Sequence, residues 1–330
     1  MKELFEKLPD EQKHEIKKKS QPDWTSPMLA TLTHDYFSDE NWIYERKLDG
    51  ERCLCFKSGK KVELKSRNNR VLNDTYPELV QELEKQETGN FIADGEIVAF
   101  EGDVTSFSRL QNRMHSKKSG GGDVAVYYYL FDLLYVEGHD ITKLALRHRK
   151  SILKRAIEFS NKLRFTAHRN KEGKKYHKEA CSKGWEGVIA KAADSTYVHS
   201  RSKKWLKFKC VNQQEFVIGG FTDPQGERIG FGALLIGYYD DGDFHYAGKV
   251  GTGYDDKLLE KLSKELKNIE RKSSPFEEEV KEKGAHWVKP KLVGEVGFTE
   301  WTSDGKLRHP RFLGLRRDKK ARNVVREKAK

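Results

Sequence analysis

The sequence is poor in cysteine, proline and apolar residues: its 330 residues include four cysteines, eight prolines and 36% hydrophobic side chains. No run approaches the roughly 18 apolar residues that a membrane-spanning helix needs. Residues 1–20 contain no apolar stretch of the kind found in signal peptides. We therefore expect a soluble, cytoplasmic protein without a membrane partner.

Cysteine is too scarce for a disulfide-rich scaffold. Cys53 and Cys55 are two residues apart on a predicted strand, whereas Cys181 and Cys210 are each isolated in the sequence. No second close pair completes the four-ligand spacing of a structural zinc site. We expect buried free thiols in a reducing compartment.

Charge is abundant and unbalanced. Charged residues make up 35% of the chain, and the net charge is +12. This excess predicts a polyanionic partner, with nucleic acid as the leading candidate. A basic protein without such a partner is the alternative, and charge alone does not decide between them.

The N-terminal two thirds of the chain reads as alternating strands and helices. Residues 1–24 form a charge-rich, weakly helical arm, interpreted equally well as a functional basic arm or as a solvated helix without a role. The first domain is expected at 25–211. A hairpin turns at residues 58–60, helices are predicted over 147–159 and 176–183, and buried strands are predicted over 91–100 and 124–135.

The remaining segment, 212–330, differs in composition and in its predicted secondary structure. Glycines punctuate short predicted strands such as 233–239 and 244–250, and one amphipathic helix is predicted over 255–269. Several short strands with a single helix are typical of a small β-barrel. The chain is therefore predicted to be α+β, with antiparallel sheets and flanking helices followed by a barrel.

Segment 45–52, ERKLDGER, places Lys47 ahead of an Asp-Gly turn. Alone, this pattern indicates no more than a surface lysine before a turn. Six further short segments accompany it in order, namely SRN (66–68), DGE (94–96), LFD (130–132), EGVIAK (186–191), WLKFK (205–209) and RHPRFLGLRRDK (308–319).

These residue types suit phosphoryl chemistry. The strand period of two puts Lys207 and Lys209 on one face, and two neighbouring ammonium groups favour a bound phosphate. Glu96 and Glu186 offer the hard oxygen ligands that Mg²⁺ prefers, although ordinary salt bridging is the alternative. A lysine that attacks phosphorus must be neutral, so nearby cations or a metal should favour that form.

Together the seven segments resemble the signature motifs of covalent nucleotidyltransferases, the superfamily of DNA ligases, RNA ligases and mRNA capping enzymes. The resemblance implies a nucleotidyltransferase (adenylation) domain over 25–211 and an OB-fold domain over 212–330. It also implies ATP as the nucleotide and Mg²⁺ or Mn²⁺ as the metal, bound by Glu96 and Glu186.

Carried over position by position, the resemblance assigns Lys47 as the residue that forms lysyl-AMP. Asp49 would support this lysine or its metal-bound water, and Phe131 would stack on adenine. A core aromatic is the alternative for Phe131. The implied nucleotide-binding residues are Glu45, Lys47, Arg52, Arg67, Glu96, Phe131, Glu186, Lys207 and Lys209. The C-terminal motif, which in ligases closes over the active site to orient pyrophosphate, supplies Arg308, His309, Arg316, Asp318 and Lys319.

The match narrows further over residues 25–320. Segments 27–30, 107–113, 214–224, 230–237 and 246–253 resemble the ligase domain of bacterial ligase D, which works in non-homologous end joining, usually with a Ku homodimer. The resemblance implies a monomeric, nucleoid-associated enzyme that seals 3′-hydroxyl and 5′-phosphate ends at nicks in duplex DNA. Ligase D usually carries polymerase and phosphoesterase modules, and because neither is present here we expect a separately encoded ligase.

Several alternatives stay open from sequence. A capping guanylyltransferase shares the lysine motif and an Arg-x-Asp-Lys element, which residues 316–319 fit. An RNA ligase, an NAD-dependent ligase and an inactive DNA-binding module fit less well. The sequence does not decide between end joining and general nick repair.

Overall fold

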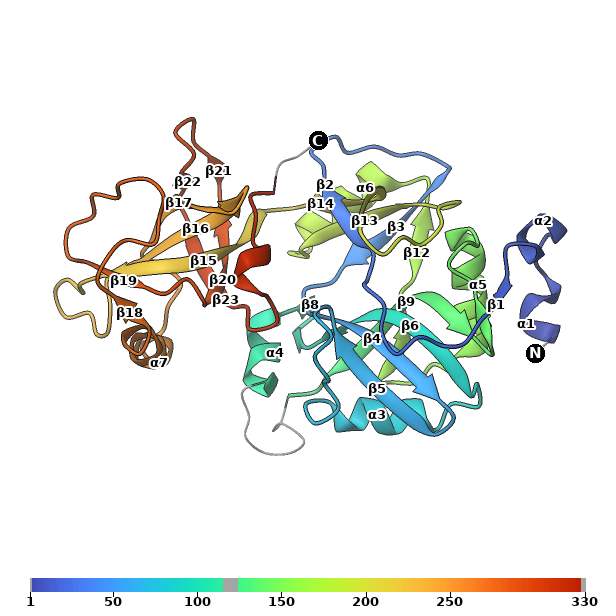
Figure 1. Cartoon of the computed structure of the whole chain (residues 1–330). Helices are drawn as coiled ribbons and strands as arrows, with labels where there is room; N and C mark the ends of the chain where they lie inside the picture. Colours follow the sequence, from blue (N-terminus) through green and yellow to red (C-terminus); the bar gives the residue numbers. More distant parts are fainter. Residues whose placement is uncertain (1, 115–123, 328–330) are drawn as a thin grey trace. The chain divides into compact units, whose positions relative to one another are not determined.

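The computed structural model describes residues 2–114 and 124–327. The chain divides into two compact units, the first ending at Cys210 and the second beginning at Val211 (Figure 1). The fold is α+β, as predicted, and each unit is built on largely antiparallel sheet. None of the described helices is long and apolar enough to cross a membrane.

The larger sheet of the first unit runs in the order β1-β10-β9-β6-β4-β5, with β11 paired to β9. Its strands are β1 (Lys17–Lys18), β4 (Glu51–Ser58), β5 (Lys61–Ser66), β6 (Asn90–Val98), β9 (Tyr127–Val136), β10 (His139–Asp140) and β11 (Leu163–Phe165). The predicted hairpin is the β4–β5 pair, in which Ser58 lies opposite Lys61.

The second sheet of this unit runs in the order β12-β3-β13-β14-β2. Its strands are β2 (Leu29–Leu32), β3 (Trp42–Lys47), β12 (His168–Asn170), β13 (Gly187–Ala192) and β14 (Arg201–Lys209). A short pair, β7 (Phe100–Glu101) and β8 (Val104–Thr105), follows β6.

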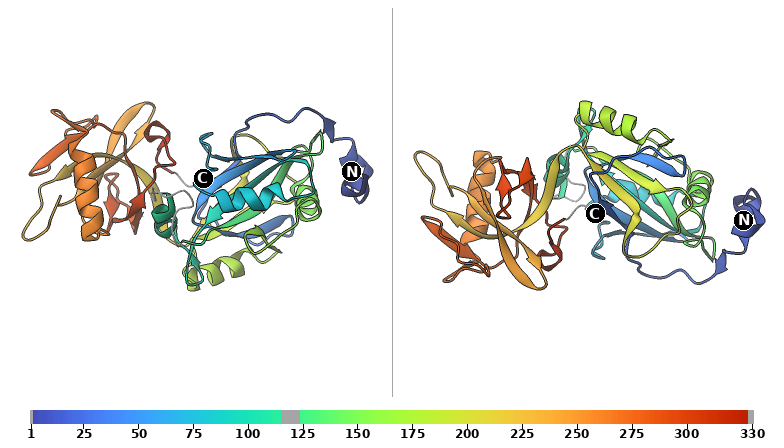
Figure 2. Two further views of the ribbon diagram at one scale, coloured as in Figure 1. Left: turned by 90° about the horizontal axis from the view of Figure 1, so that it is seen from below. Right: turned by 90° about the horizontal axis from the view of Figure 1, so that it is seen from above.

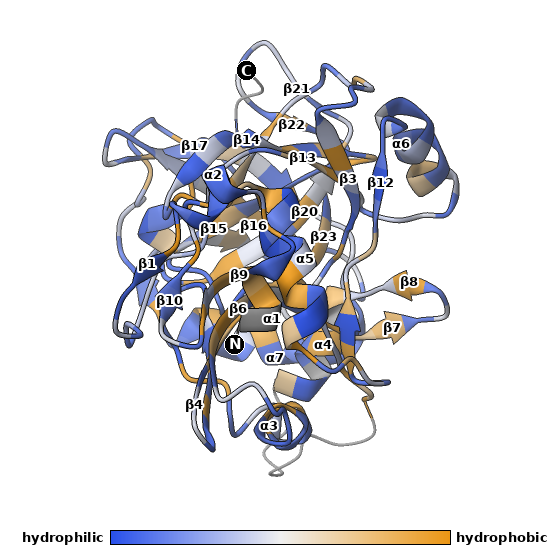
Figure 3. Ribbon diagram, turned by 90° about the vertical axis from the view of Figure 1, so that its right-hand side faces the viewer, coloured by the Kyte–Doolittle hydropathy of each residue, from blue (hydrophilic) through white to orange (hydrophobic). Residues whose placement is uncertain are grey.

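The helices of this unit are α1 (Lys2–Glu6), α2 (Asp10–Lys13), α3 (Pro77–Glu84), α4 (Phe107–Met114), α5 (Leu146–Ala156) and α6 (Gly173–Ser182). Helices α3 and α5 bury leucines and isoleucine against the larger sheet, whereas α6 covers the second sheet (Figure 1 and Figure 2). Figure 3 shows hydrophobic residues along β9, the central strand of this core. Helix α5 ends earlier than predicted, because Ile157 is already extended.

The N-terminal arm contacts the first unit. Leu8 is buried in the core of the larger sheet, and Leu4, Phe5 and Ile16 pack against it. Strand β1 adds to the sheet edge by pairing with β10. The arm therefore extends the sheet and covers part of its core.

The second unit is an OB-fold. Its strands are β15 (Asn212–Thr222), β16 (Leu234–Asp240), β17 (Asp243–Val250), β18 (Glu270–Arg271), β19 (Ala285–Val288), β20 (Val293–Phe298), β21 (Glu300–Trp301), β22 (Leu307–Arg308) and β23 (Arg311–Leu315). Helix α7 (Asp256–Lys267) buries Leu259, Leu262 and Leu266 against the barrel, and Asp255 caps it by accepting a hydrogen bond from Leu258 N. A 3₁₀ turn, η1 (Ala321–Asn323), follows.

The cysteines divide into two groups. Cys53 and Cys55 are buried free thiols, as predicted. The same prediction is wrong for Cys181 and Cys210, which form a disulfide. Although 29 residues separate them, Cys181 lies in the last turn of α6 and Cys210 directly follows β14, the strand that pairs with β13 after α6.

Candidate active site

Strand register places four of the predicted site residues on one face of the second sheet. Lys47 of β3 and Lys209 of β14 both lie opposite Gly187 of β13. One row further, Glu45 and Lys207 both lie opposite Ile189. Because paired residues on neighbouring strands point to the same side, Lys47, Glu45, Lys207 and Lys209 share a face.

The opposite face of this sheet is apolar. Tyr44, Val188, Ala190 and Phe208 alternate with the charged residues along their strands and pack against α6. Burial of this face anchors the sheet, and a one-residue slip would exchange the lysines for the core side chains. Hydrophobic packing thus fixes the orientation of the lysines.

Two motif glycines are required by close backbone approach. A Cβ on Gly187 would lie 2.0 Å from the carbonyl oxygen of Phe208, and its φ of +145° also disfavours other residues. A Cβ on Gly50 would lie 2.2 Å from the carbonyl oxygen of Ile97 and 3.1 Å from Glu96 Cγ. The turn after Lys47 therefore packs directly on β6, beside Glu96.

Lys47 forms an ion pair with Glu186, the residue immediately before β13. The side chains are 17% and 8% exposed, so the pair is largely shielded from water. Asp49, two residues after Lys47, accepts a hydrogen bond from Phe107 N at 3.1 Å, and its own N–H donates to Thr105 Oγ1. This places a carboxylate at the N-terminus of α4, where the helix dipole favours negative charge.

The larger sheet contributes Arg52 and Glu96, which lie opposite each other on β4 and β6. Arg52 donates two 2.6 Å hydrogen bonds to the buried carboxylate of Asp94, and Tyr197 donates a third to it. Burial alone would lower the pKa of Arg52, but Asp94 outweighs burial and raises it. Arg67 follows β5 and is half-buried.

Glu45 is at the centre of a buried charge cluster. Lys150 Nζ lies 2.5 Å from its Oε1 and Lys191 Nζ 2.6 Å from its Oε2, and all three side chains are about 2% exposed. Burial would raise the pKa of Glu45, yet the two lysines together hold it below its usual value. Both carboxylate oxygens of Glu45 therefore accept hydrogen bonds from lysines.

Phe131 lies between the two sheets. Its ring packs edge-on against Trp205 and is buried. The Lys191 ammonium is 4.1 Å and the Arg52 guanidinium 4.6 Å from its centroid. Phe131 thus belongs to an apolar cluster and also lies beside the buried charges, a position from which a planar base could be contacted.

The C-terminal motif forms an ion-pair network within the second unit. Arg316 donates two 2.9 Å hydrogen bonds to Asp318 and one of 2.7 Å to Glu295. Lys319 Nζ lies 2.8 Å from Glu215 Oε1. Burial alone would lower the pKa of Arg316 and raise that of Asp318. Their ion pair outweighs burial, so the pKa of Arg316 is raised and that of Asp318 is lowered. Across the β21–β22 pair, the exposed side chain of Arg308 contacts Glu300. Next to this pair, His309 Nδ1 lies 3.4 Å from Thr299 Oγ1.

Residues 27–209 match the family described as "ATP dependent DNA ligase domain", and residues 227–319 match its "ATP dependent DNA ligase C terminal region". The chain belongs to the ATP-dependent DNA ligase family. The resemblance to a ligase predicted from the seven segments is thus confirmed.

Relatives of this chain include two multifunctional non-homologous end joining proteins named LigD. The protein from Pseudomonas aeruginosa is 36% identical over 316 residues, and that from Mycobacterium tuberculosis is 38% identical over 311. These alignments cover 93% and 92% of this chain but 37% and 40% of the relatives. The chain therefore spans about two fifths of the length of these curated relatives.

A solved structure, "mycobacterial DNA ligase D complexed with ATP and MES", superposes with a TM-score of 0.67 at 35% identity. The match covers 93% of this ligase and 100% of that chain. A "DNA ligase" from Hyperthermus butylicus is 32% identical over 84% of this chain. The adenylation domain and OB-fold predicted from sequence are confirmed by the family and structural matches.

Two ligase residues beside Glu45 were not singled out from sequence. Lys191 ends segment 186–191, and its alternation with Gly187 and Ile189 on β13 could have placed it on the active-site face. Lys150 comes from the buried side of α5, and nothing in the pattern of that basic helix distinguishes it.

Lys191 is expected to make the stability of this chain depend on pH. Burial lowers its pKa to about 8, although Glu45 opposes the shift. Between pH 8 and its usual value of 10.5 the unfolded chain holds more protons at this group, so the free energy of unfolding should rise with pH. We expect wild type to gain about 1–3 kcal/mol relative to Lys191→Met across this window, measured by urea unfolding. Parallel pH profiles for the two proteins would contradict this assignment.

Proposed function

We propose that this chain seals 3′-hydroxyl/5′-phosphate nicks in duplex DNA through a covalent lysyl-AMP on Lys47. The observation that carries the proposal is the shielded contact of Lys47 with Glu186, in the same row of the sheet as Lys209. A lysine shielded from water, on a face lined by further cations, suits attack on a phosphate.

In the first step Lys47 Nζ attacks the α-phosphorus of ATP, the bond to the pyrophosphate oxygen breaks, and pyrophosphate leaves. Glu186 orients the amine, and Lys207 and Lys209 neutralise charge on the α-phosphate oxygens. AMP then passes to the 5′-phosphate of the nick, freeing Lys47, and the 3′-hydroxyl displaces AMP to form the phosphodiester. Each step is an in-line displacement, so positioning and charge neutralisation supply most of the rate.

Glu96 and Glu186 suit a divalent metal. Both offer carboxylate oxygens, the ligands that Mg²⁺ and Mn²⁺ favour. Glu186 contacts the nucleophile, and Glu96 packs against the turn that follows it. Bound there, Mg²⁺ or Mn²⁺ would act as a Lewis acid that offsets negative charge on the phosphate oxygens.

Adenine recognition is proposed for the cluster around Glu45. Phe131 offers its ring to the base, and Lys150 and Lys191 hold the Glu45 carboxylate in one orientation. Arg52 and Arg67 would bind ribose, phosphate or the 5′-phosphate end. Asp49 would hold the nucleophile's turn on α4, and Arg316, Asp318 and Lys319 would orient pyrophosphate in the first step.

The cellular role is proposed from the relatives named as non-homologous end joining proteins. We propose that the chain acts as a monomer in DNA break repair, with a Ku homodimer as its partner. General nick repair is the alternative role. Joining of separate duplexes and sealing of a nick, each measured with and without a Ku protein, would distinguish them, since an end-joining enzyme should join separate duplexes faster with Ku while nick sealing stays unchanged.

A two-stage labelling assay tests the activity. The protein is incubated with α-labelled ATP or GTP and Mg²⁺, then supplied with singly nicked duplex DNA. We expect label on the protein from ATP, followed by its loss as AMP and sealing of the nick. Label from GTP alone would instead indicate a capping-type guanylyltransferase, and label from neither would refute nucleotidyl transfer.

DNA affinity should depend steeply on salt. The chain carries a net charge of +12. Contacts of its lysines and arginines with the DNA phosphates would release counterions from the duplex. We expect the Kd for nicked duplex to rise by at least about 10-fold between 50 and 200 mM salt, with little dependence on base sequence. Filter binding with two unrelated duplexes measures both properties, and a flat salt response would contradict a phosphate-based interface.

A further inference from the structure

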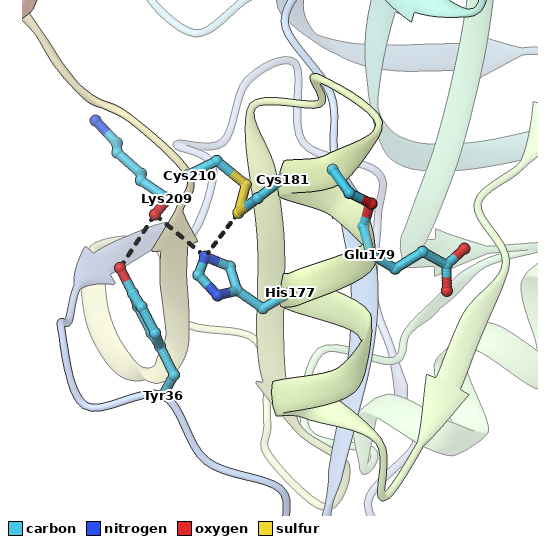
Figure 4. The surroundings of a disulfide bond; sticks show 7 residues. Tyr36, His177, Glu179, Cys181, Lys209 and Cys210 are labelled. Atoms are coloured by element: carbon cyan, nitrogen blue, oxygen red, sulfur yellow. Dashed lines mark hydrogen bonds between the residues drawn. A yellow bond between two sulfur atoms is a disulfide. The ribbon is translucent and has the colours of Figure 1, made fainter.

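Three potential metal ligands, none of them a carboxylate assigned to Mg²⁺, gather at the end of α6. His177 Nε2 lies 3.4 Å from Cys181 Sγ, and Cys181 is bonded to Cys210 (Figure 4). The ligand atoms of all three residues lie within 4.8 Å of one another, and each residue is half-buried. His177 and Cys181 are four residues apart on α6, so they share a helix face.

We propose that His177, Cys181 and Cys210 form a binding site for one thiophilic divalent ion, of the Zn²⁺ class, when the disulfide is reduced. Tetrahedral zinc with Zn–S of about 2.3 Å and Zn–N of about 2.0 Å sets its ligand atoms roughly 3.5–3.8 Å apart. The 3.4 Å between His177 Nε2 and Cys181 Sγ is already within about 0.1 Å of this range. Two thiol sulfurs that are no longer bonded must separate to a similar distance, so only Cys210 has to move.

The histidine is held in position by its neighbours. Its ring packs at a tilt against Tyr36, with the ring centroids 4.0 Å apart, and contacts Phe208 edge-on. Nε2 also lies 3.2 Å from the carbonyl oxygen of Lys209, and metal binding would replace this hydrogen bond. That carbonyl stays satisfied, because the Tyr36 hydroxyl donates to it at 3.1 Å. Figure 4 shows the Lys209 side chain pointing away from the sulfurs, so its ammonium group does not block the site.

Reduction of the disulfide and binding of the metal require only a dithiol and the divalent ion. A dithiol reductant delivers two electrons and two protons to the disulfide, leaving thiols on Cys181 and Cys210 and oxidised dithiol as product. A divalent ion then displaces both thiol protons to solvent, and neutral His177 donates its Nε2 lone pair. Two thiolates and one divalent cation sum to zero charge. Water completes the coordination, as in other three-ligand zinc sites.

The ligand type separates this site from the magnesium carboxylates. Thiolate and imidazole favour zinc-class ions, whereas carboxylates favour Mg²⁺. The other two cysteines do not compete, because complete burial raises the pKa of the Cys53 and Cys55 thiols. The site also adjoins the active site through the backbone, since Cys210 N donates to the carbonyl oxygen of Glu186 at 3.1 Å.

Metal binding by the full chain tests the proposal without ATP or DNA, so its outcome is independent of ligase activity. Metal-free protein is titrated with Co²⁺ under anaerobic conditions, in the oxidised form and after reduction by a phosphine. We expect the reduced form to bind one Co²⁺ per chain, with thiolate-to-cobalt charge-transfer absorption that Zn²⁺ abolishes. The oxidised form should show no such absorption. Zn²⁺ should raise the Tm of the reduced form only.

Variants identify the ligands. His177→Gln keeps both cysteines and can still form the disulfide, so a folded oxidised form provides its own control. We expect His177→Gln, Cys181→Ser and Cys210→Ser each to weaken Co²⁺ binding by more than about 100-fold, since loss of even an outer-shell partner costs roughly 10–100-fold. Cys55→Ala should bind like wild type. Reduced protein that binds no Co²⁺, or binding unchanged in His177→Gln and Cys210→Ser, overturns the proposal and leaves a disulfide alone.

Discussion

Lys47→Ala is expected to lose both label transfer from ATP and sealing of nicked DNA, by a factor on the order of 10⁴–10⁶. Alanine removes the only atom that can carry the adenylyl group in the proposed mechanism, while the strand that bears it remains fixed by apolar packing. Glu186 would retain its place before β13. Gel analysis of labelled protein measures the first step, and sealing of a labelled nick measures the complete reaction.

A control lysine and a bypass substrate make this prediction specific. Lys61 is 75% exposed at the start of β5 and forms an ion pair with Glu63, so Lys61→Ala should keep wild-type activity. Lys47→Ala should still seal a nick whose 5′-phosphate already carries AMP, because that step needs no lysine nucleophile. An alanine variant that still accepts label from ATP would falsify the assignment of Lys47.

Local periodicity correctly predicted that Lys207 and Lys209 share one face of their strand. The period of two along residues 205–209 put Lys207 and Lys209 together, and the register with β13 and β3 brings Lys47 and Glu45 to the same face. The β-barrel after Cys210 and the hairpin at residues 58–60 could also be predicted from the sequence, because turn residues and strand alternation are local signals.

Contacts between residues far apart in the sequence could not be predicted in this way. Lys150 reaches Glu45 across 105 residues, and Cys181 reaches Cys210 only because β13 and β14 pair. The ion pair of Arg316 with Glu295 likewise depends on the pairing of β20 with β23. Sequence motifs predicted candidate site residues, but tertiary pairing decides what each one contacts.

Segment 130–132 shows this division within three residues. Phe131 was given a role, whereas its neighbour Asp132 was not. Asp132 is fully buried and accepts two 2.8 Å hydrogen bonds from Arg149 of α5, which is also fully buried. Arg149 donates further to the carbonyl oxygens of Leu144 and Ser195. This pair ties α5 to β9, the strand that carries Phe131.

Arg149→Met is therefore expected to lower the free energy of unfolding by about 3–5 kcal/mol, because it leaves the Asp132 carboxylate buried without its cation. Urea unfolding followed by circular dichroism measures the change. Arg147→Met on the same helix is the matched control: its ion pair with Asp194 is exposed and should contribute less than about 1 kcal/mol. Adding Asp132→Leu to Arg149→Met removes the uncompensated charge and should restore most of the loss. Equal effects of Arg147→Met and Arg149→Met, or no recovery in the double variant, would show that the buried pair does not anchor α5 to β9.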